Sequence, residues 1–174
     1  MIWNIDTTHS HIDFSVRHMG FSTVRGRFRE FSGFLEADEN NQPQRLEVTI
    51  DTSSIDTGVA DRDNHLRSAD FFDAETHPQI TFKSTNIESK GGNRYAITGD
   101  LDMHGVSKPV TFDVEGAEPI SDPYGLQRAA ASGTAELNRK DWGLTWNQIL
   151  EAGGVMVSET VKLSFEAEIV AEQQ

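Results

Sequence analysis

Residues 12–17 read Ile12-Asp13-Phe14-Ser15-Val16-Arg17, with apolar side chains at the even positions and polar side chains at the odd ones. Successive side chains of a β-strand point to opposite faces of a sheet, so this alternation predicts a strand with one apolar face and one face in water. The same period of two recurs in residues 24–28, 31–35, 46–50, 80–82, 95–103, 110–114, 129–137 and 161–169. The sequence therefore predicts an all-β protein of about nine strands.

Turn-forming stretches separate many of these strands, among them Asn40-Asn41-Gln42-Pro43 and Gly91-Gly92-Asn93. Short connections between strands that expose one face to solvent indicate antiparallel pairing. Residues 57–73 break the alternation and, with helix-starting residues at Thr57 and Asp61, predict a short helix near residues 60–70. Such a pattern fits either a β-sandwich or a closed up-and-down barrel, and periodicity alone does not distinguish them.

The chain of 174 residues suits a single domain spanning residues 1–174. It has no cysteine, which excludes disulfides and thiolate metal sites, and its net charge of -13 argues against binding to nucleic acid or to an anionic membrane. Without a long apolar segment or a secretory signal, the sequence predicts no stable membrane insertion. We expect a cytoplasmic protein, or a periplasmic one if a signal has been removed.

One predicted strand carries unusually small side chains. If Leu137 faces inward, parity places Ala135, Gly133, Ala131 and Ala129 on the same face. Unfilled apolar volume costs ~24 cal/mol per Å³, so this row needs large partners or a guest molecule. Two interpretations remain open: the aromatic residues fill the space, or an apolar tunnel holds a ligand.

The stretch Asp61-Arg62-Asp63-Asn64-His65-Leu66-Arg67-Ser68-Ala69-Asp70-Phe71-Phe72-Asp73 admits a catalytic and a structural interpretation. In the catalytic one, His65 is a general base oriented by Asp61, and Arg62 holds an anion. The chain lacks a nucleophile elbow, a zinc-protease motif and a phosphate-binding loop, so we predict no catalytic residue and no cofactor. In the structural one, the polar residues fasten a helix over one end of the sheet, while Phe71 and Phe72 reach toward the interior.

Three residues of one face, His9, His11 and Asp13, are of the types that bind zinc. A pair of histidines two residues apart is common by chance, and these positions face away from the apolar row. We therefore predict no metal site.

Arginines cluster near the start of the chain. If a hairpin places Phe14 opposite Phe28, then Arg17 lies opposite Arg25, which is unfavourable unless an anion lies nearby. This predicts an anionic group near Arg17 and Arg25. The alternative is an outward charged row that keeps the strand soluble.

Several stretches together resemble the YceI-like family of lipocalin-like polyisoprenoid-binding proteins. They begin with Trp3-Asn4-Ile5-Asp6-Thr7-Thr8-His9-Ser10-His11-Ile12-Asp13-Phe14 and continue, in order, through residues 16–19, 24–28, 55–58, 62–66, 70–73, 77–82, 99–106 and 137–144. The resemblance implies an antiparallel, lipocalin-like barrel of about eight strands around an apolar tunnel. It also implies homodimers, and ligands such as isoprenoid quinones, polyprenyl phosphates or fatty acid relatives, with no established catalysis.

The expected function is to bind and sequester or carry a long apolar amphiphile in an internal tunnel. The candidate ligand-binding residues are Phe14, Val16, Phe28, Phe71, Phe72, Ala131, Gly133, Trp142, Trp146, Arg17 and Arg25. Two alternatives stay open: an enzyme that acts on a lipid-like substrate through His65, Asp61 and Arg62, and an interaction protein with a filled core and no ligand.

Overall fold

The computed structural model describes residues 1–150 and 155–173. Its strands are β1 (Ile2–His18), β2 (Ser22–Phe28), β3 (Phe31–Ala37), β4 (Pro43–Asp51), β5 (Ile55–Asp56), β6 (Gln79–Gly91), β7 (Arg94–Met103), β8 (Val106–Gly116), β9 (Ile120–Ser121), β10 (Gln127–Asn138) and β11 (Thr160–Ala171). The helices are α1 (Ala60–Arg67) and two 3₁₀ turns, η1 (Thr52–Ser54) and η2 (Arg139–Trp142). In these residues no helix is long and apolar enough to cross a membrane.

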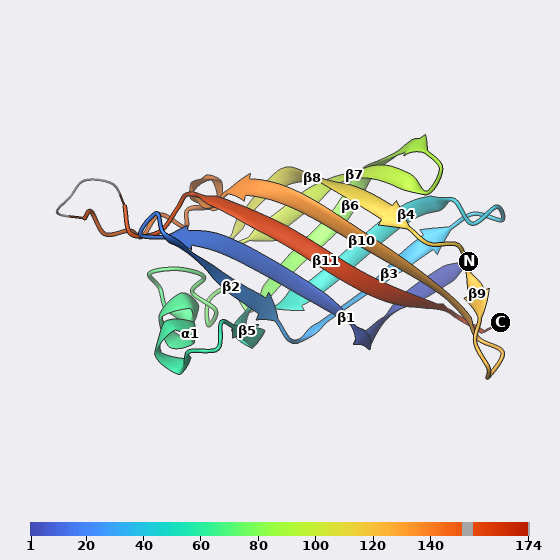
Figure 1. The fold of residues 1–174 in the computed structure, drawn as a ribbon, viewed down its shortest axis with the longest axis horizontal. Coiled ribbons are helices and arrows are strands. Elements are labelled where there is room, and N and C mark those ends of the chain that lie inside the picture. The colour runs from blue at the N-terminus through green and yellow to red at the C-terminus, as the bar shows by residue number, and fades with distance from the viewer. Residues whose placement is uncertain (151–154, 174) are drawn as a thin grey trace.

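Eight strands close into an antiparallel barrel (Figure 1). They follow one another in the order β1, β11, β10, β8, β7, β6, β4 and β3, and β3 pairs again with β1. The predicted barrel and the predicted short helix are confirmed, and the sandwich alternative is wrong. Full closure explains why each long strand alternates so regularly, because one face of each looks inward along its whole length.

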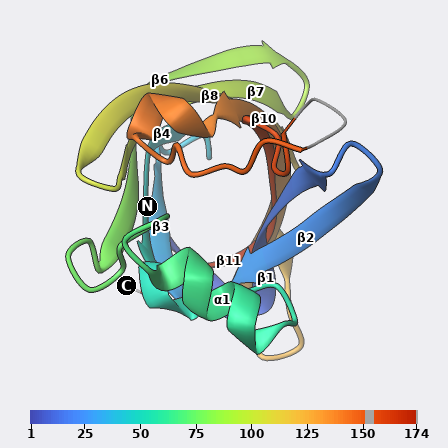
Figure 2. The same ribbon diagram turned by 90° about the vertical axis from the view of Figure 1, so that its left-hand side faces the viewer.

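Strand β1 is long enough to pair with two strands on one of its sides. Its first residues, Ile2–Asn4, pair with β3, and its last part, Ile12–His18, pairs with β2. The barrel thus has two different ends. At the end that we call the helix end, β2 and β5 lie beside α1, as the view along the barrel shows (Figure 2); the opposite end, the terminal end, holds both chain termini and β9 (Figure 1).

The hairpin of β1 and β2 has a register that differs from the expected one. Phe14 lies opposite Gly26 rather than Phe28, and Arg17 lies opposite Thr23 rather than Arg25. The reason is steric: a Cβ on the residue at position 26 would lie 2.7 Å from Cε1 of Phe14, so only glycine leaves room for the ring. The arginine pair that suggested an anion site is therefore not formed across the hairpin.

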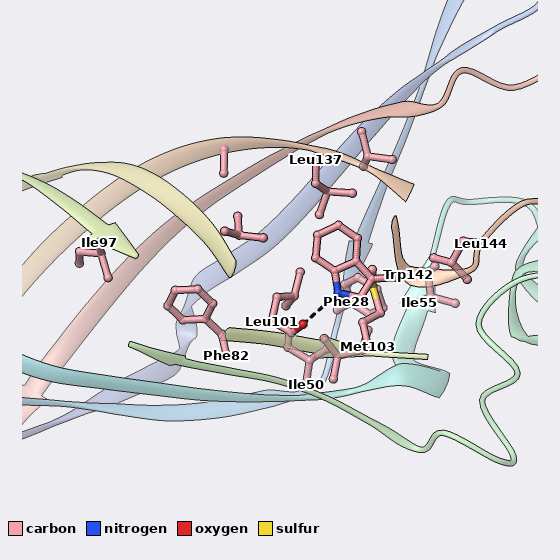
Figure 3. Packing of buried hydrophobic residues seen from close by; sticks show 14 of the residues in the cluster. Phe28, Ile50, Ile55, Phe82, Ile97, Leu101, Met103, Leu137, Trp142 and Leu144 are labelled. Carbon is pink, nitrogen blue, oxygen red and sulfur yellow. Dashed lines mark hydrogen bonds between the residues drawn. The ribbon is translucent and has the colours of Figure 1, made fainter. Parts of the chain in front are cut away.

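A packed core occupies the barrel next to η2 (Figure 3). The indole of Trp142 lies among apolar side chains that include Phe28, Ile50, Met103 and Leu137. Only 2% of Trp142 is exposed, and its Nε1 donates a hydrogen bond of 2.9 Å to the carbonyl oxygen of Leu101. Trp142 is consequently held in a packed cluster, whereas other members of this cluster, such as Phe28 and Leu137, also line the cavity of the barrel.

Candidate ligand-binding cavity

An apolar cavity of about 730 Å³ lies inside the barrel. All eight barrel strands contribute to its wall, and the wall extends from Trp3 at the terminal end to Trp146 at the helix end. Small-molecule sites typically have volumes of roughly 300–1,000 Å³ and mainly apolar walls. The cavity therefore has the size and the chemistry of a site for one apolar guest.

The period of two in the sequence builds this wall. In β1 the side chains of Ile12, Phe14 and Val16 all line the cavity, and in β11 those of Leu163 and Phe165 do so. Because the intervening positions are polar and face water, each strand is stable in the barrel without a second sheet to cover it.

Seven of the expected ligand-binding residues lie in the cavity wall: Phe14, Val16, Phe28, Phe71, Phe72, Ala131 and Trp146. Four others, Gly133, Trp142, Arg17 and Arg25, do not. Trp142 belongs to the packed core described above. Arg17 and Arg25 are exposed on the outside of the β1–β2 hairpin, where Arg17 donates to Thr23 Oγ1 at 3.1 Å.

The space in front of the row of small residues in β10 is empty only in part. Ala129 and Ala131 line the cavity, and the cross-strand neighbours of Ala131 are Gly116 and Ala167, which are also small. Further along, the ring of Phe165 covers Gly133 so closely that an added Cβ would lie 2.7 Å from its Cζ. An aromatic ring thus fills the space in front of one part of this row, and the other part faces the cavity.

Arg62 supplies a positive charge to the cavity wall at the helix end. Its Nε donates to Thr57 Oγ1 at 2.7 Å and its Nη2 to the Thr57 carbonyl oxygen at 2.8 Å. Asp63 in turn accepts from the Thr57 backbone N–H at 2.8 Å, which fixes this loop against α1. No carboxylate of the described residues lies within 4 Å of the Arg62 guanidinium, so Arg62 is oriented by neutral groups and its charge is available to a guest.

His65 belongs to an aromatic wall and is not paired with Asp61 as the catalytic interpretation requires. Its Nε2 lies 2.9 Å from Oδ2 of Asp70, and its ring packs edge-on against Phe71 and Trp146, with centroids 5.1 and 4.7 Å away. Asp61 is exposed. The polar contact of His65 thus orients a flat ring, which lines this end of the cavity together with two larger rings.

No pattern in the sequence pointed to the part played by Arg139. This side chain is 3% exposed, and its guanidinium donates to the carbonyl oxygens of Ser158, Leu144, Trp146 and Val157 at 2.9, 2.6, 2.9 and 3.3 Å. Burial lowers the pKa of Arg139 below its usual range. The residue gathers two chain segments around one charge and so positions Trp146 in the cavity wall.

At the terminal end, several uncharged polar side chains line the cavity wall. It contains Asn40, Asn41, Gln42 and Asn93 from two connections between strands, and the Tyr95 hydroxyl donates to Gln42 Oε1 at 3.3 Å. In the sequence these residues read only as turn formers, since their convergence depends on how the strands are paired. The two ends of the cavity thus differ in their polar groups: the Arg62 guanidinium lies at the helix end and a group of amides at the terminal end, and the acidic Asp61 and Glu118 also belong to the wall.

The histidines near the start of the chain do not converge on a shared site. His9 bonds Asp6 at 3.0 Å, whereas His11 turns to Asp13. Asp6, His9 and Glu168 do lie close together, but Nη1 of Arg128 lies 2.9 Å from Asp6 Oδ2 and already supplies the positive charge there. The hydrogen bonds from His9 and Arg128 lower the pKa of Asp6 to about 2.

Proteins with similar sequences occur in several bacteria. A UPF0312 protein of Vibrio parahaemolyticus is 43% identical over 143 residues, which cover 80% of this chain and 76% of that one. A UPF0312 protein of Pectobacterium atrosepticum is 41% identical over 138 residues, covering 79% of this chain and 71% of that one.

Solved structures with this fold include Burkholderia cenocepacia BcnA, with a TM-score of 0.82, 27% identity and coverage of 97% of this chain and 99% of that one. The Campylobacter jejuni YCEI protein has a TM-score of 0.79 and 28% identity, with 90% of each chain covered. A Saccharophagus degradans domain described as polyisoprenoid binding shares the fold, with a TM-score of 0.71, 18% identity and 98% coverage of both chains. The model of the YceI-like domain matches residues 3–169, and the chain therefore belongs to the YceI-like family.

Proposed function

We propose that this protein binds a long apolar amphiphile of the polyisoprenoid class and sequesters or carries it. The observation that carries the proposal is the apolar cavity of about 730 Å³, walled by inward side chains of all eight barrel strands. The Saccharophagus degradans domain with the same fold is described as polyisoprenoid binding, which supports an isoprenoid tail as the guest.

The hydrophobic effect provides the driving force. Each methylene moved from water to an apolar wall contributes ~0.8 kcal/mol, so about ten of them contribute ~8 kcal/mol. Association and ordering of a flexible tail oppose this by several kcal/mol. A tail of isoprenoid or fatty acid length therefore binds with a useful surplus, and a short one does not.

The head group is proposed to lie at the helix end, near Arg62 and Thr57. Arg17 and Arg25, which the sequence suggested for this role, lie outside the cavity, whereas Arg62 lines it and has no carboxylate partner among the described residues. A guanidinium is well suited to phosphate and carboxylate oxygens. A polyprenyl phosphate is accordingly the head-group class that the wall fits best.

Binding is favoured over catalysis by the placement of His65. The catalytic interpretation requires Asp61 to orient His65. In the structure Nε2 of His65 lies against Asp70 instead, and its ring packs against Phe71 and Trp146 as part of an aromatic wall. The hollow lumen likewise favours a carrier over an interaction protein with a filled core.

A homodimer stays a prediction, which light scattering would test.

Mass spectrometry of the organic extract from freshly purified protein tests the proposal. We expect an isoprenoid or a related long-chain amphiphile in the extract. Stripped protein should bind farnesol and farnesyl phosphate, which share a tail and differ in the head group. An empty extract, together with no binding of either probe, would overturn the proposed function.

The head-group assignment has its own test. Arg62→Gln should weaken farnesyl phosphate binding by about tenfold or more, because a hydrogen bond to a charged group contributes ~1.5–3 kcal/mol, and it should leave farnesol binding nearly unchanged. Arg94→Gln is the matched control, since Arg94 is exposed and does not line the cavity. Equal losses for the two probes would contradict the placement of the head group.

A further inference from the structure

The helix end carries an exposed apolar surface outside the cavity, which we call the tip ledge: Met19, Phe21, Ile149 and Val155. Phe21 and Ile149 are 85% and 82% exposed, and the other two are more than two-fifths exposed. Backbone contacts hold the three segments side by side: Met19 N–H donates to Met156 O at 2.8 Å, and Ile149 pairs with Val155. The β1–β2 turn and the segment before β11 meet at this extremity of the molecule (Figure 1).

The charge around the tip ledge differs from that of the rest of the chain. Residues 14–29 contain Arg17, Arg25, Arg27 and Arg29 and no acidic residue, in a protein of net charge -13. Residues 142–150 and 155–158 contain no charged side chain, and Glu151 lies outside the described residues. Within the described chain, Arg17 and Arg25 have no carboxylate within 4 Å.

The tip ledge is continuous with the wall of the cavity. His18 and Val24 line the cavity and flank the β1–β2 turn, while Met156 and Val157 line it directly after Val155. The exposed side chain of Met19 follows His18 directly and so lies beside this part of the cavity wall.

We propose that the tip ledge docks on the surface of a phospholipid bilayer. Phe21 and Ile149 enter the boundary between head groups and acyl chains, and Arg17 and Arg25 bind lipid phosphates. The exposed apolar side chains suit the acyl-chain region of such a surface, and the arginines beside them, which have no carboxylate partner in the described chain, suit its phosphate layer. A bilayer of zwitterionic lipid offers these phosphates without the net charge that would repel this acidic protein.

Docking would give the cavity direct access to lipids, a role that rests on the proposed function. Docking itself does not require a guest, so the two proposals can fail separately. Phe21 does not line the cavity, and its replacement should leave farnesol binding unchanged.

Co-sedimentation of the full chain with phosphatidylcholine vesicles tests the inference. The wild-type protein should bind, and Phe21→Ser should weaken binding by about tenfold or more, because burial of a phenylalanine side chain contributes ~1.5–3 kcal/mol. Arg25→Gln should also weaken binding. Tyr124→Ser should not, because Tyr124, although 88% exposed, follows β9 at the terminal end of the barrel (Figure 1).

Three results would overturn the inference. The first is absence of vesicle binding by the wild-type protein, and the second is an equal effect of the Phe21→Ser and Tyr124→Ser variants. The third is a dimer in light scattering that Phe21→Ser converts to a monomer without any change in vesicle binding, since the ledge would then be a contact between two copies of this chain.

Discussion

Replacing Ala131 by phenylalanine should weaken guest binding strongly while leaving the barrel stable. Ala131 lines the cavity, and its neighbours across the ladder, Gly116 and Ala167, are too small to fill the space in front of it. A phenyl ring there would take the place of about four tail methylenes at ~0.8 kcal/mol each, or ~3 kcal/mol in all. Affinity for farnesol should fall by about a hundredfold.

The neighbouring inner position gives the opposite expectation for stability. At Gly133 even one added methyl group would meet the ring of Phe165, with its Cβ 2.7 Å from Cζ, so Gly133→Ala should destabilise the fold by about 1–3 kcal/mol. Ala131→Phe adds far more volume in the same row, yet should change the free energy of unfolding by less. Urea unfolding measures both values, and fluorescence titration with stripped protein measures farnesol affinity.

Ser132→Phe is the matched control, because it introduces the same ring on the same strand but on the exposed face. This variant should bind farnesol as the wild type does. The reasoning would be refuted if Ala131→Phe kept full affinity, or if it lost as much stability as Gly133→Ala, since either result would mean that the lumen beside Ala131 is not hollow.

Trp142→Phe removes the hydrogen bond to Leu101 O and leaves that carbonyl buried, so urea unfolding should show a loss of about 1–3 kcal/mol; a loss below about 0.5 kcal/mol would contradict the importance of this bond. Arg139→Lys keeps the charge but loses the planar fork that reaches four carbonyls, so proteolysis should cut the segment before β11 faster than in the wild type. Asp6 has a folded-state pKa lowered to about 2 from 3.8, so its contribution to stability is present above pH 3.8 and is lost as the pH falls toward 2. In Asp6→Asn the fall of stability with acid over that interval should become shallower. His9 has a raised pKa, so its contribution is complete below pH 6.5 and is lost above it, and His9→Gln should flatten that part of the curve.

Local patterns were sufficient for the secondary structure and for much of the cavity wall. Side-chain alternation depends only on neighbouring residues, and it identified the inward face of β1, where Phe14 and Val16 line the cavity. The break in alternation located α1 correctly at Ala60–Arg67. The resemblance to the YceI-like family then favoured the barrel over the sandwich, a choice that the periodicity had left open.

The errors all concern contacts between distant parts of the chain. The hairpin register placed Phe14 opposite Phe28, because the sequence does not show that the Phe14 ring needs the space above Gly26. Trp142 was expected among the ligand-binding residues, but a hydrogen bond to a carbonyl on β7 holds it in the core. Parity specifies a face and does not specify what occupies the space in front of that face.

The sequence by itself determined that the chain is a set of antiparallel strands with one apolar face each, because strand geometry converts a period of two directly into two faces. The tertiary structure decided which inward side chains meet a ring and which meet open space, as the contrast between Gly133 and Ala131 shows. It also decided that Arg62, rather than Arg17 or Arg25, brings a charge to the cavity. These outcomes depend on strand register and barrel closure, which join residues far apart in the chain.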